Sequence, residues 1–293
     1  MISTEIWRDP LVQRFIRKNG GKSPEFAIEK YVQECLAEAR QDHLAIDVEL
    51  IASVLGVKRR IAEYSFAGRI YADPSGQLVM DLNVGDSEPR RRFTCAHELI
   101  HTAFPGFKRE TRYRLDQSTG INQPNRSEEE SLCDLGASMM LMPAALVAGN
   151  YRLEANGMKA VEQLADDASV SLEAAGNRLV KLSDRPAAFL VLEEGHKPAD
   201  RAALRRGESV EPKLRVRYAV LNNVNSFVPP YKSVDPDSVY GRAARGSQLV
   251  QELAALPGAS GTQNRFLIHA GRYPRFDGDK QICRVLAVGL AAS

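Results

Sequence analysis

Two histidines and a glutamate stand close together in the segment RRFTCAHELIH, which runs from Arg91 to His101. On a helix, His97 and His101 share one face, because side chains four residues apart lie about 6 Å from each other at Cβ. Two neutral imidazoles at this spacing can occupy two corners of a tetrahedral zinc site. Glu98 lies on the flank of that face, where a carboxylate can accept a proton from a water molecule that the metal activates. The segment therefore predicts a metal site with its own general base.

The alternative is an ordinary amphipathic helix, because HExxH fixes only three positions and also occurs in proteins that bind no metal. The surrounding residues favour the metal site. An apolar stripe runs beside the histidines and indicates a half-buried helix; its members are Phe93, Ala96, Ile100 and Ala103.

A zinc site needs a third ligand, and a separate acidic segment, SEEE from Ser127 to Glu130, can supply it. Glu130 stands at the head of a stripe of small and apolar residues, where a carboxylate without a partner would be costly to bury. A capping box formed by Ser127 and Glu130 would explain the same residues without a metal. We predict Glu130 as the third ligand and keep Glu129 as the alternative.

The expected ion is Zn2+, with Mn2+ as the alternative, because nitrogen and carboxylate ligands suit both and a histidine pair favours zinc. We do not assign Cys95 or Cys133 as ligands, because buried thiols usually act as small hydrophobic side chains. The four cysteines are far apart and form no CxxC pair, which is typical of reduced thiols in a cytoplasmic protein.

Helical and extended patterns surround these residues. The periodicity predicts helices over 24–42, 46–57, 87–104 and 128–141, and a hairpin with strands over 68–72 and 77–83. Small residues at Cys133, Gly136 and Ala137 would let the fourth helix pack closely on the helix that carries His97. The polar segment 105–126 is too long for a tight connection.

The composition of the sequence changes from Met158 onwards. We predict two short helices over 158–182, with a turn at Ser169 to Ser171, and then strands over 187–192, 214–221, 265–270 and 282–290. Between Asn150 and Asp184, four basic residues are opposed by six acidic residues. Because neutralising phosphates supplies most non-specific DNA affinity, we expect no direct DNA binding by this segment.

The HExxH segment and the segment that begins at Glu130 together resemble the ImmA/IrrE family of bacterial metallopeptidases. Members carry an R-x-x-F-x-x-A-H-E-x-x-H helix, followed by a helix with an E-x-x-(A/C)-(N/D) pattern that ends in L-M-P. RRRFTCAHELIH and ESLCDLGASMMLMP match these patterns, within residues 30–145. The resemblance implies His97, His101 and Glu130 as metal ligands and Glu98 as general base. It also implies that strand 77–83 could pair with an extended peptide substrate.

The order of segments resembles the IrrE-like members of that family. The resemblance implies an α+β chain with a zincin-like metallopeptidase domain over 1–149, a helix-turn-helix-like helical segment over 150–185 and a C-terminal α+β GAF-like domain over 186–293. LADDASVSLEAAGNRL, from Leu164, fits the helix-turn-helix pattern except at Ser169, where glycine is usual. A Cβ at this position makes the left-handed turn conformation less favourable.

The resemblance implies a zinc-dependent metallo-endopeptidase with narrow specificity, which cleaves a helix-turn-helix transcriptional repressor and so switches on a stress or mobile-element response. The alternative is a non-catalytic regulator or sensor that binds DNA, a partner protein or a small ligand through residues 150–293. The net charge of +2 is too small to argue for nucleic acid or a membrane surface. The chain has no run of about 18 apolar residues. We therefore expect a cytoplasmic protein that acts on a protein substrate.

Overall fold

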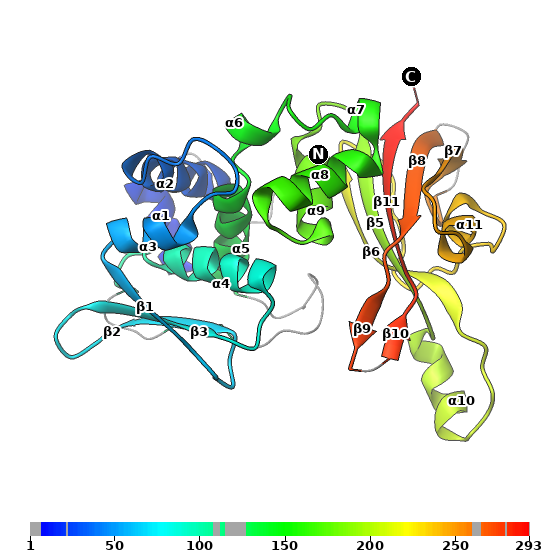
Figure 1. Cartoon of the computed structure of the whole chain (residues 1–293), viewed down its shortest axis with the longest axis horizontal. Coiled ribbons are helices and arrows are strands. Elements are labelled where there is room, and N and C mark those ends of the chain that lie inside the picture. The colour runs from blue at the N-terminus through cyan, green and yellow to red at the C-terminus, as the bar shows by residue number, and fades with distance from the viewer. Residues whose placement is uncertain are drawn as a thin grey trace. The chain divides into compact units, whose positions relative to one another are not determined.

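The structure is a computed structural model, and it describes residues 7–21, 23–107, 112–114, 127–259, 265–278 and 280–292 (Figure 1). The chain divides into two compact units. The first comprises residues 1–147 and 165–171, and the second comprises residues 148–164 and 172–293. Each unit combines helices with a sheet, so the predicted α+β class is confirmed. Among the described residues, no helix is long and apolar enough to cross a membrane.

The helices of the first unit begin at strong local start signals. They are α1 (Pro10–Lys18), α2 (Pro24–Glu38), α3 (Val48–Val54), α4 (Glu88–His101), α5 (Glu128–Leu141) and α6 (Ala144–Val147). Asp9, Ser23, Asp47 and Ser127 each accept a hydrogen bond from a backbone amide of the helix that follows. The four helices predicted in this region are confirmed as α2 to α5. Helix α1 is not predicted, although Asp9 and Pro10 form a start signal.

The sheet of the first unit contains β1 (Val57–Ala62), β2 (Gly68–Ala72), β3 (Leu78–Asn83) and β4 (Arg112–Arg114), in the order β1-β3-β2-β4. The predicted hairpin of β2 and β3 is confirmed. Its turn is held by Asp73, whose Oδ1 accepts hydrogen bonds from the backbone amides of Ser75 and Gln77. Strand β3 pairs with β1 on one side and β2 on the other. It has no free edge, so the expectation that 77–83 pairs with a peptide is wrong.

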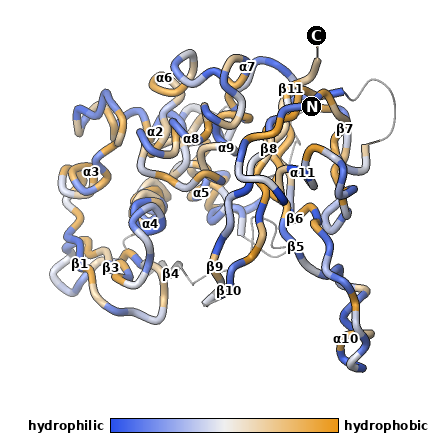
Figure 2. The backbone as a smooth tube through the Cα atoms, turned by 45° about the vertical axis from the view of Figure 1, so that its right-hand side comes forward, coloured by the Kyte–Doolittle hydropathy of each residue, from blue (hydrophilic) through white to orange (hydrophobic). Residues whose placement is uncertain are grey.

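The second unit is built around a five-stranded antiparallel sheet in the order β6-β5-β11-β8-β7. These strands are β5 (Ala187–Gly195), β6 (Lys213–Asn222), β7 (Val250–Ala255), β8 (Arg265–Arg272) and β11 (Arg284–Ala291). Strand β11 lies in the centre and is almost wholly hydrophobic (Figure 2), because both of its faces are covered. The four predicted strands of this region are confirmed, whereas β7 is not predicted.

Helices cover both faces of this sheet (Figure 1), with α9 (Leu172–Leu182) on one face and α11 (Val239–Arg245) on the other. Gly176 of α9 lies against β5, where an added Cβ would stand 2.3 Å from the ring of Phe189. The remaining elements are α7 (Leu153–Asn156), α8 (Met158–Ala168), the 3-10 turn Pro198–Asp200, α10 (Arg201–Arg205) and the hairpin of β9 (Arg275–Asp277) and β10 (Lys280–Ile282).

Helices α8 and α9 confirm the two short helices predicted over 158–182. Ser169, in the turn between them, adopts φ +51°, which is the left-handed conformation expected there. Because serine carries a Cβ, this turn has a conformational cost that glycine would avoid. The long segment predicted over 105–126 lies largely outside the described residues.

Candidate metal centre

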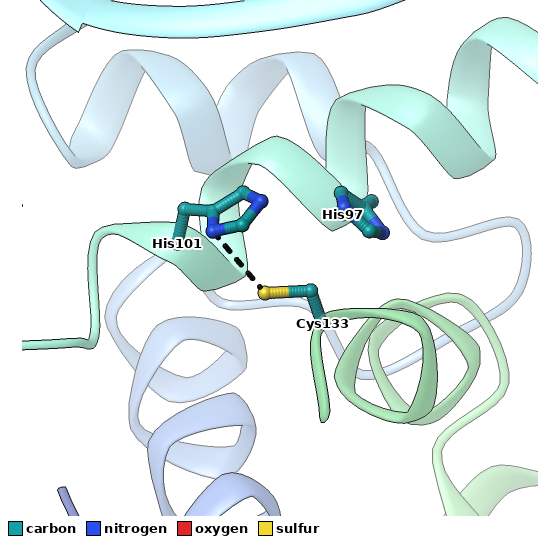
Figure 3. Close-up of side chains that lie close together, drawn as sticks. All are labelled: His97, His101 and Cys133. Atoms are coloured by element: carbon teal, nitrogen blue, oxygen red, sulfur yellow. Dashed lines mark hydrogen bonds between the residues drawn. The ribbon is translucent and has the colours of Figure 1, made fainter. Parts of the chain in front are cut away.

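Helix α4 brings His97 and His101 together in the interior of the first unit. The two imidazole rings have centroids 5.1 Å apart and meet edge to face (Figure 3). Their side chains are 0% and 1% exposed, and Glu98 between them is also fully buried. The prediction that the histidines share one helix face is therefore confirmed, and that face points inward.

Helix α5 presents Glu130 to both imidazoles. Its Oε2 lies 3.2 Å from Nε2 of His97, and its Oε1 lies 3.4 Å from Nε2 of His101. Despite these short distances, neither Nε2 atom has a hydrogen-bond partner of acceptable geometry among the described residues. Two imidazole nitrogens and one carboxylate thus converge on a single place, which is the donor set expected of a zinc site.

Glu129, the alternative ligand, lies on the opposite side of His101. Its Oε1 is 2.9 Å from Nδ1 of His101, away from the Nε2 atom that faces Glu130. Asp134 makes the equivalent contact with His97, at 2.8 Å from Nδ1. The structure therefore brings His97, His101, Glu130 and the alternative Glu129 together, but it gives Glu129 and Glu130 different neighbours.

Cys133 also belongs to this cluster, although the sequence pattern does not predict it as a ligand. Its Sγ lies 3.4 Å from Nδ1 of His101 (Figure 3), and the residue is fully buried. One donor atom from each of His97, His101 and Cys133 fits within 4.8 Å, so these three residues form a second possible donor set. The available signal was position, since Cys133 lies three residues after Glu130, one turn along the same helix.

Charge favours Glu130 over Cys133 as the third donor. Burial raises the pKa of the Cys133 thiol to about 12, whereas only a thiolate is an effective metal ligand. Burial also acts to raise the pKa of Glu130, but the two imidazoles beside it hold that pKa well below its usual range. Glu130 is therefore already an anion at neutral pH.

The surroundings of the imidazoles are strongly anionic. Burial acts to lower the pKa of His101, but Cys133, Glu129 and Glu130 together raise it well above its usual value. Three carboxylates lie at the two rings: Glu129, Glu130 and Asp134. Buried carboxylates are tolerated when they are paired or when they serve a metal. The residues present therefore fit a divalent cation.

Comparisons with known proteins match the segment that carries this cluster. Residues 55–180 match the family described as the IrrE N-terminal-like domain. The radiation response metalloprotease IrrE of Deinococcus radiodurans is 27% identical over 175 residues, which are 57% of this chain and 51% of that protein. Residues 55–180 belong to the ImmA/IrrE-type family. The chain spans about half the length of this curated relative.

The fold likeness extends beyond the ImmA/IrrE-type segment. A solved structure described as a Mycobacterium tuberculosis transcriptional regulator aligns with 96% of this chain and 80% of its own, with a TM-score of 0.54. Sequence identity in this alignment is 15%, so the likeness shows a shared fold.

Two glycines set the packing around the two histidines. A Cβ on Gly68 of β2 would stand 2.4 Å from Cγ2 of Thr94 and 3.4 Å from Oε1 of Glu98, so this glycine lets α4 lie directly on the sheet. A Cβ on Gly136 of α5 would stand 2.8 Å from the side chain of Ile100. The predicted close packing of α5 on α4 is confirmed at Gly136, and it brings Glu130 within reach of both histidines.

The edge of the sheet nearest to α4 is β4. Among the described residues, β4 pairs only with β2, and α4 packs against β2, β3 and β4. An extended segment that joins this sheet beside α4 would therefore pair with β4. Residues 108–111 and 115–126, which precede and follow β4 in the chain, lie outside the described residues.

Proposed function

We propose that this chain is a zinc-dependent metallo-endopeptidase in which His97, His101 and Glu130 hold Zn2+ and Glu98 is the general base. The observation that carries this proposal is the convergence of both Nε2 atoms on the Glu130 carboxylate. The donor set of two imidazoles and one carboxylate is that of a catalytic zinc site. Mn2+ is the alternative ion.

The bound ion would supply Lewis acidity, which polarises the scissile carbonyl and lowers the pKa of a water molecule. Glu98 supplies the proton transfer. Its carboxylate follows His97 directly, is fully buried and lies beside Gly68 of β2. We assign it to take a proton from the attacking water at a carboxylate oxygen and to deliver that proton to the leaving amine.

The proposed substrate is an extended segment of a protein. Its backbone would extend the sheet at β4, an edge strand that pairs only with β2 among the described residues and contacts α4. Strand addition recognises the substrate through hydrogen bonds to its backbone rather than through its side chains. It therefore does not explain narrow sequence specificity by itself. We assign that specificity to the parts of the chain after the peptidase.

The family points to the kind of substrate. We propose that it is a helix-turn-helix transcriptional repressor in the cytoplasm, whose cleavage switches on a stress or mobile-element response. The similar Deinococcus protein is named a radiation response metalloprotease, which supports a stress response. We retain the three-part organisation as a proposal: zincin-like over 1–149, helix-turn-helix-like over 150–185 and GAF-like over 186–293.

Replacement of Glu98 by glutamine tests the proposed chemistry. Glu98→Gln should keep one zinc per chain and lose cleavage of purified candidate repressors by at least about 100-fold, because the amide cannot accept the proton. Fragments are followed by mass spectrometry, and zinc by elemental analysis. Glu88→Gln, at the exposed start of the same helix, is the matched control and should cleave normally. Cleavage by Glu98→Gln at the normal rate would refute the assigned role.

A second candidate function is a regulator or sensor that acts without catalysis, through residues 150–293. The printed name of the similar Mycobacterium tuberculosis structure favours it. Direct DNA reading by α9 is not part of this candidate, because acidic residues outnumber basic ones between Asn150 and Asp184. A partner protein or a small ligand would be its target. Under this alternative, Glu98→Gln would behave as the normal protein in cells.

A further inference from the structure

Two carboxylates hold the imidazoles from the side opposite to Glu130. We propose that Glu129 and Asp134 are positioning residues, which keep a proton on Nδ1 of His101 and His97 and so leave Nε2, the nitrogen that faces Glu130, as the one that can lose its proton to a metal. This inference rests on the proposed metal site, and it assigns a different task to each carboxylate of α5. Glu129, which the sequence offered as a ligand, becomes the residue that orients one.

The geometry is the same at both rings. Glu129 Oε1 lies 2.9 Å from Nδ1 of His101, and Asp134 Oδ1 lies 2.8 Å from Nδ1 of His97. These are ordinary distances for a charge-assisted N–H···O bond. A carboxylate at this distance accepts a hydrogen bond from Nδ1–H and so keeps the proton on that nitrogen. When the ring is neutral, its lone pair is therefore on Nε2. Glu129 is itself only 8% exposed, so water competes little for its oxygens.

Cys133 is the competitor for Nδ1 of His101. If its S–H donated to this nitrogen, the ring proton would sit on Nε2 and the ring could not bind a metal there. The sulfur is 3.4 Å away, against 2.9 Å for the carboxylate oxygen, and a thiol is a weak donor. The anionic acceptor is therefore the stronger partner, and Glu129 decides where the proton lies.

The neighbouring glutamate shows that this task is specific to Glu129. Glu128 turns away from the histidines, and its two carboxylate oxygens accept hydrogen bonds from the backbone amides of Arg8 and Asp9, at 2.7 and 2.8 Å. The three consecutive glutamates thus have different partners. Glu128 binds the start of α1, Glu129 orients His101, and Glu130 faces both Nε2 atoms. Glu128 is a matched control for a change at Glu129.

The test compares three variants of the full chain. Glu129→Met keeps the side-chain length and removes the acceptor, Glu129→Gln keeps an acceptor oxygen, and Glu128→Met is the control. Proton–nitrogen NMR of the metal-free protein should show a strongly downfield proton on Nδ1 of His101 in the unchanged chain, in Glu129→Gln and in Glu128→Met. Glu129→Met should lose it. A change that only loosens the fold would also alter the signals of α1 and α2. Loss of the hydrogen bond alone should remove the Nδ1 signal and leave the signals of α1 and α2 unchanged.

Zinc affinity is the second readout. Glu129→Met should raise the dissociation constant for Zn2+ by about 10 to 100-fold, the usual effect of losing such a partner, whereas Glu129→Gln and Glu128→Met should change it by less than about threefold. Asp134→Leu should repeat the loss at His97, which keeps the inference testable if Glu129→Met does not fold.

Two outcomes would overturn the inference: no proton on Nδ1 of His101 in the unchanged chain, or equal zinc affinity in Glu129→Met and Glu128→Met. Failure of the proposed function looks different. In that case no variant binds zinc, while the Nδ1 proton is still present and still depends on Glu129.

Discussion

At the scale of the residue, the site offers two candidates for the third metal ligand beside the histidines. They are Glu130 and Cys133, one turn apart on the same helix. The carboxylate contacts both Nε2 atoms, whereas the thiol lies at Nδ1 of His101, where Glu129 already lies. The identity of the third donor decides the class of the site. A carboxylate leaves a metal with more Lewis acidity than a thiolate does, which suits hydrolysis.

The two donors can be separated by substitution. Glu130→Gln should raise the dissociation constant for Zn2+ by at least about 100-fold, because the site loses its only charged donor, and Cys133→Ala should leave it within about threefold. A competition titration against a chelator measures both values. The opposite ranking would show that His97, His101 and Cys133 are the ligands.

A second residue-scale feature is Asp81, a fully buried carboxylate shared by Arg60 of β1 and Arg69 of β2. The guanidinium contacts are 2.7 and 2.6 Å long. Burial acts to raise the pKa of Asp81, but the two arginines outweigh it and the pKa is lowered. A lowered pKa in the folded protein means that the ionised form stabilises the fold.

The sign of the pH dependence follows from this. The stabilisation is fully present above the pKa of an unfolded aspartate, about 3.9, and is lost as pH falls through the lower folded value. Asp81→Asn should therefore lower the free energy of unfolding by about 2 kcal/mol at pH 7 and flatten its decline below pH 4. Urea unfolding at several pH values measures both. An unchanged acid slope in the variant would contradict the assignment.

At the scale of the element, the distance between α4 and α5 places the third donor. Gly136 sets this distance, because its missing side chain leaves room for Ile100, and an added Cβ would also stand 3.0 Å from Ile28. The glycine has a cost in helix propensity of about 1 kcal/mol, which the close packing offsets. Moving α5 outward would take Glu130 away from both imidazoles.

Gly136→Val tests this packing. It should lower the free energy of unfolding by about 1 to 3 kcal/mol through overpacking and should weaken zinc binding as well. The combined variant with Ile100→Ala should lose less stability than the sum of the two single changes, because both act on one contact. Gly195→Val is the control, since no atom lies within 4 Å of its added Cβ. Simple additivity would show that Gly136 and Ile100 do not share a contact.

At the scale of the whole molecule, zinc binding should be coupled to folding. The proposed ligands come from α4 and α5, which the segment 102–127 separates in the chain, so an unfolded chain cannot hold them together. Free Zn2+ at 100 times its dissociation constant should raise the free energy of unfolding by about 2.7 kcal/mol. His97→Ala should remove this effect. Chemical unfolding with and without zinc measures it, and equal stabilisation of His97→Ala would place the metal elsewhere.

The sequence by itself determined the local features. Helical period puts His97, Glu98 and His101 on neighbouring positions of one face, and Ser127 and Asp73 begin a helix and a turn through hydrogen bonds to amides a few residues away. The left-handed turn at Ser169 is also local. These features depend on contacts within about four residues, so the order of residues is enough to predict them.

Only the tertiary structure decided the rest. Glu129 and Glu130 are adjacent in sequence and point about 100° apart on α5, so their partners depend on where α4 lies, not on their spacing. The contact of Cys133 with His101 also depends on where α4 lies. Strand β3 is predictable as a strand, but its lack of a free edge depends on β1 and β2, which flank it. Each of these outcomes depends on contacts between segments far apart in the chain, and such contacts leave no period in the sequence.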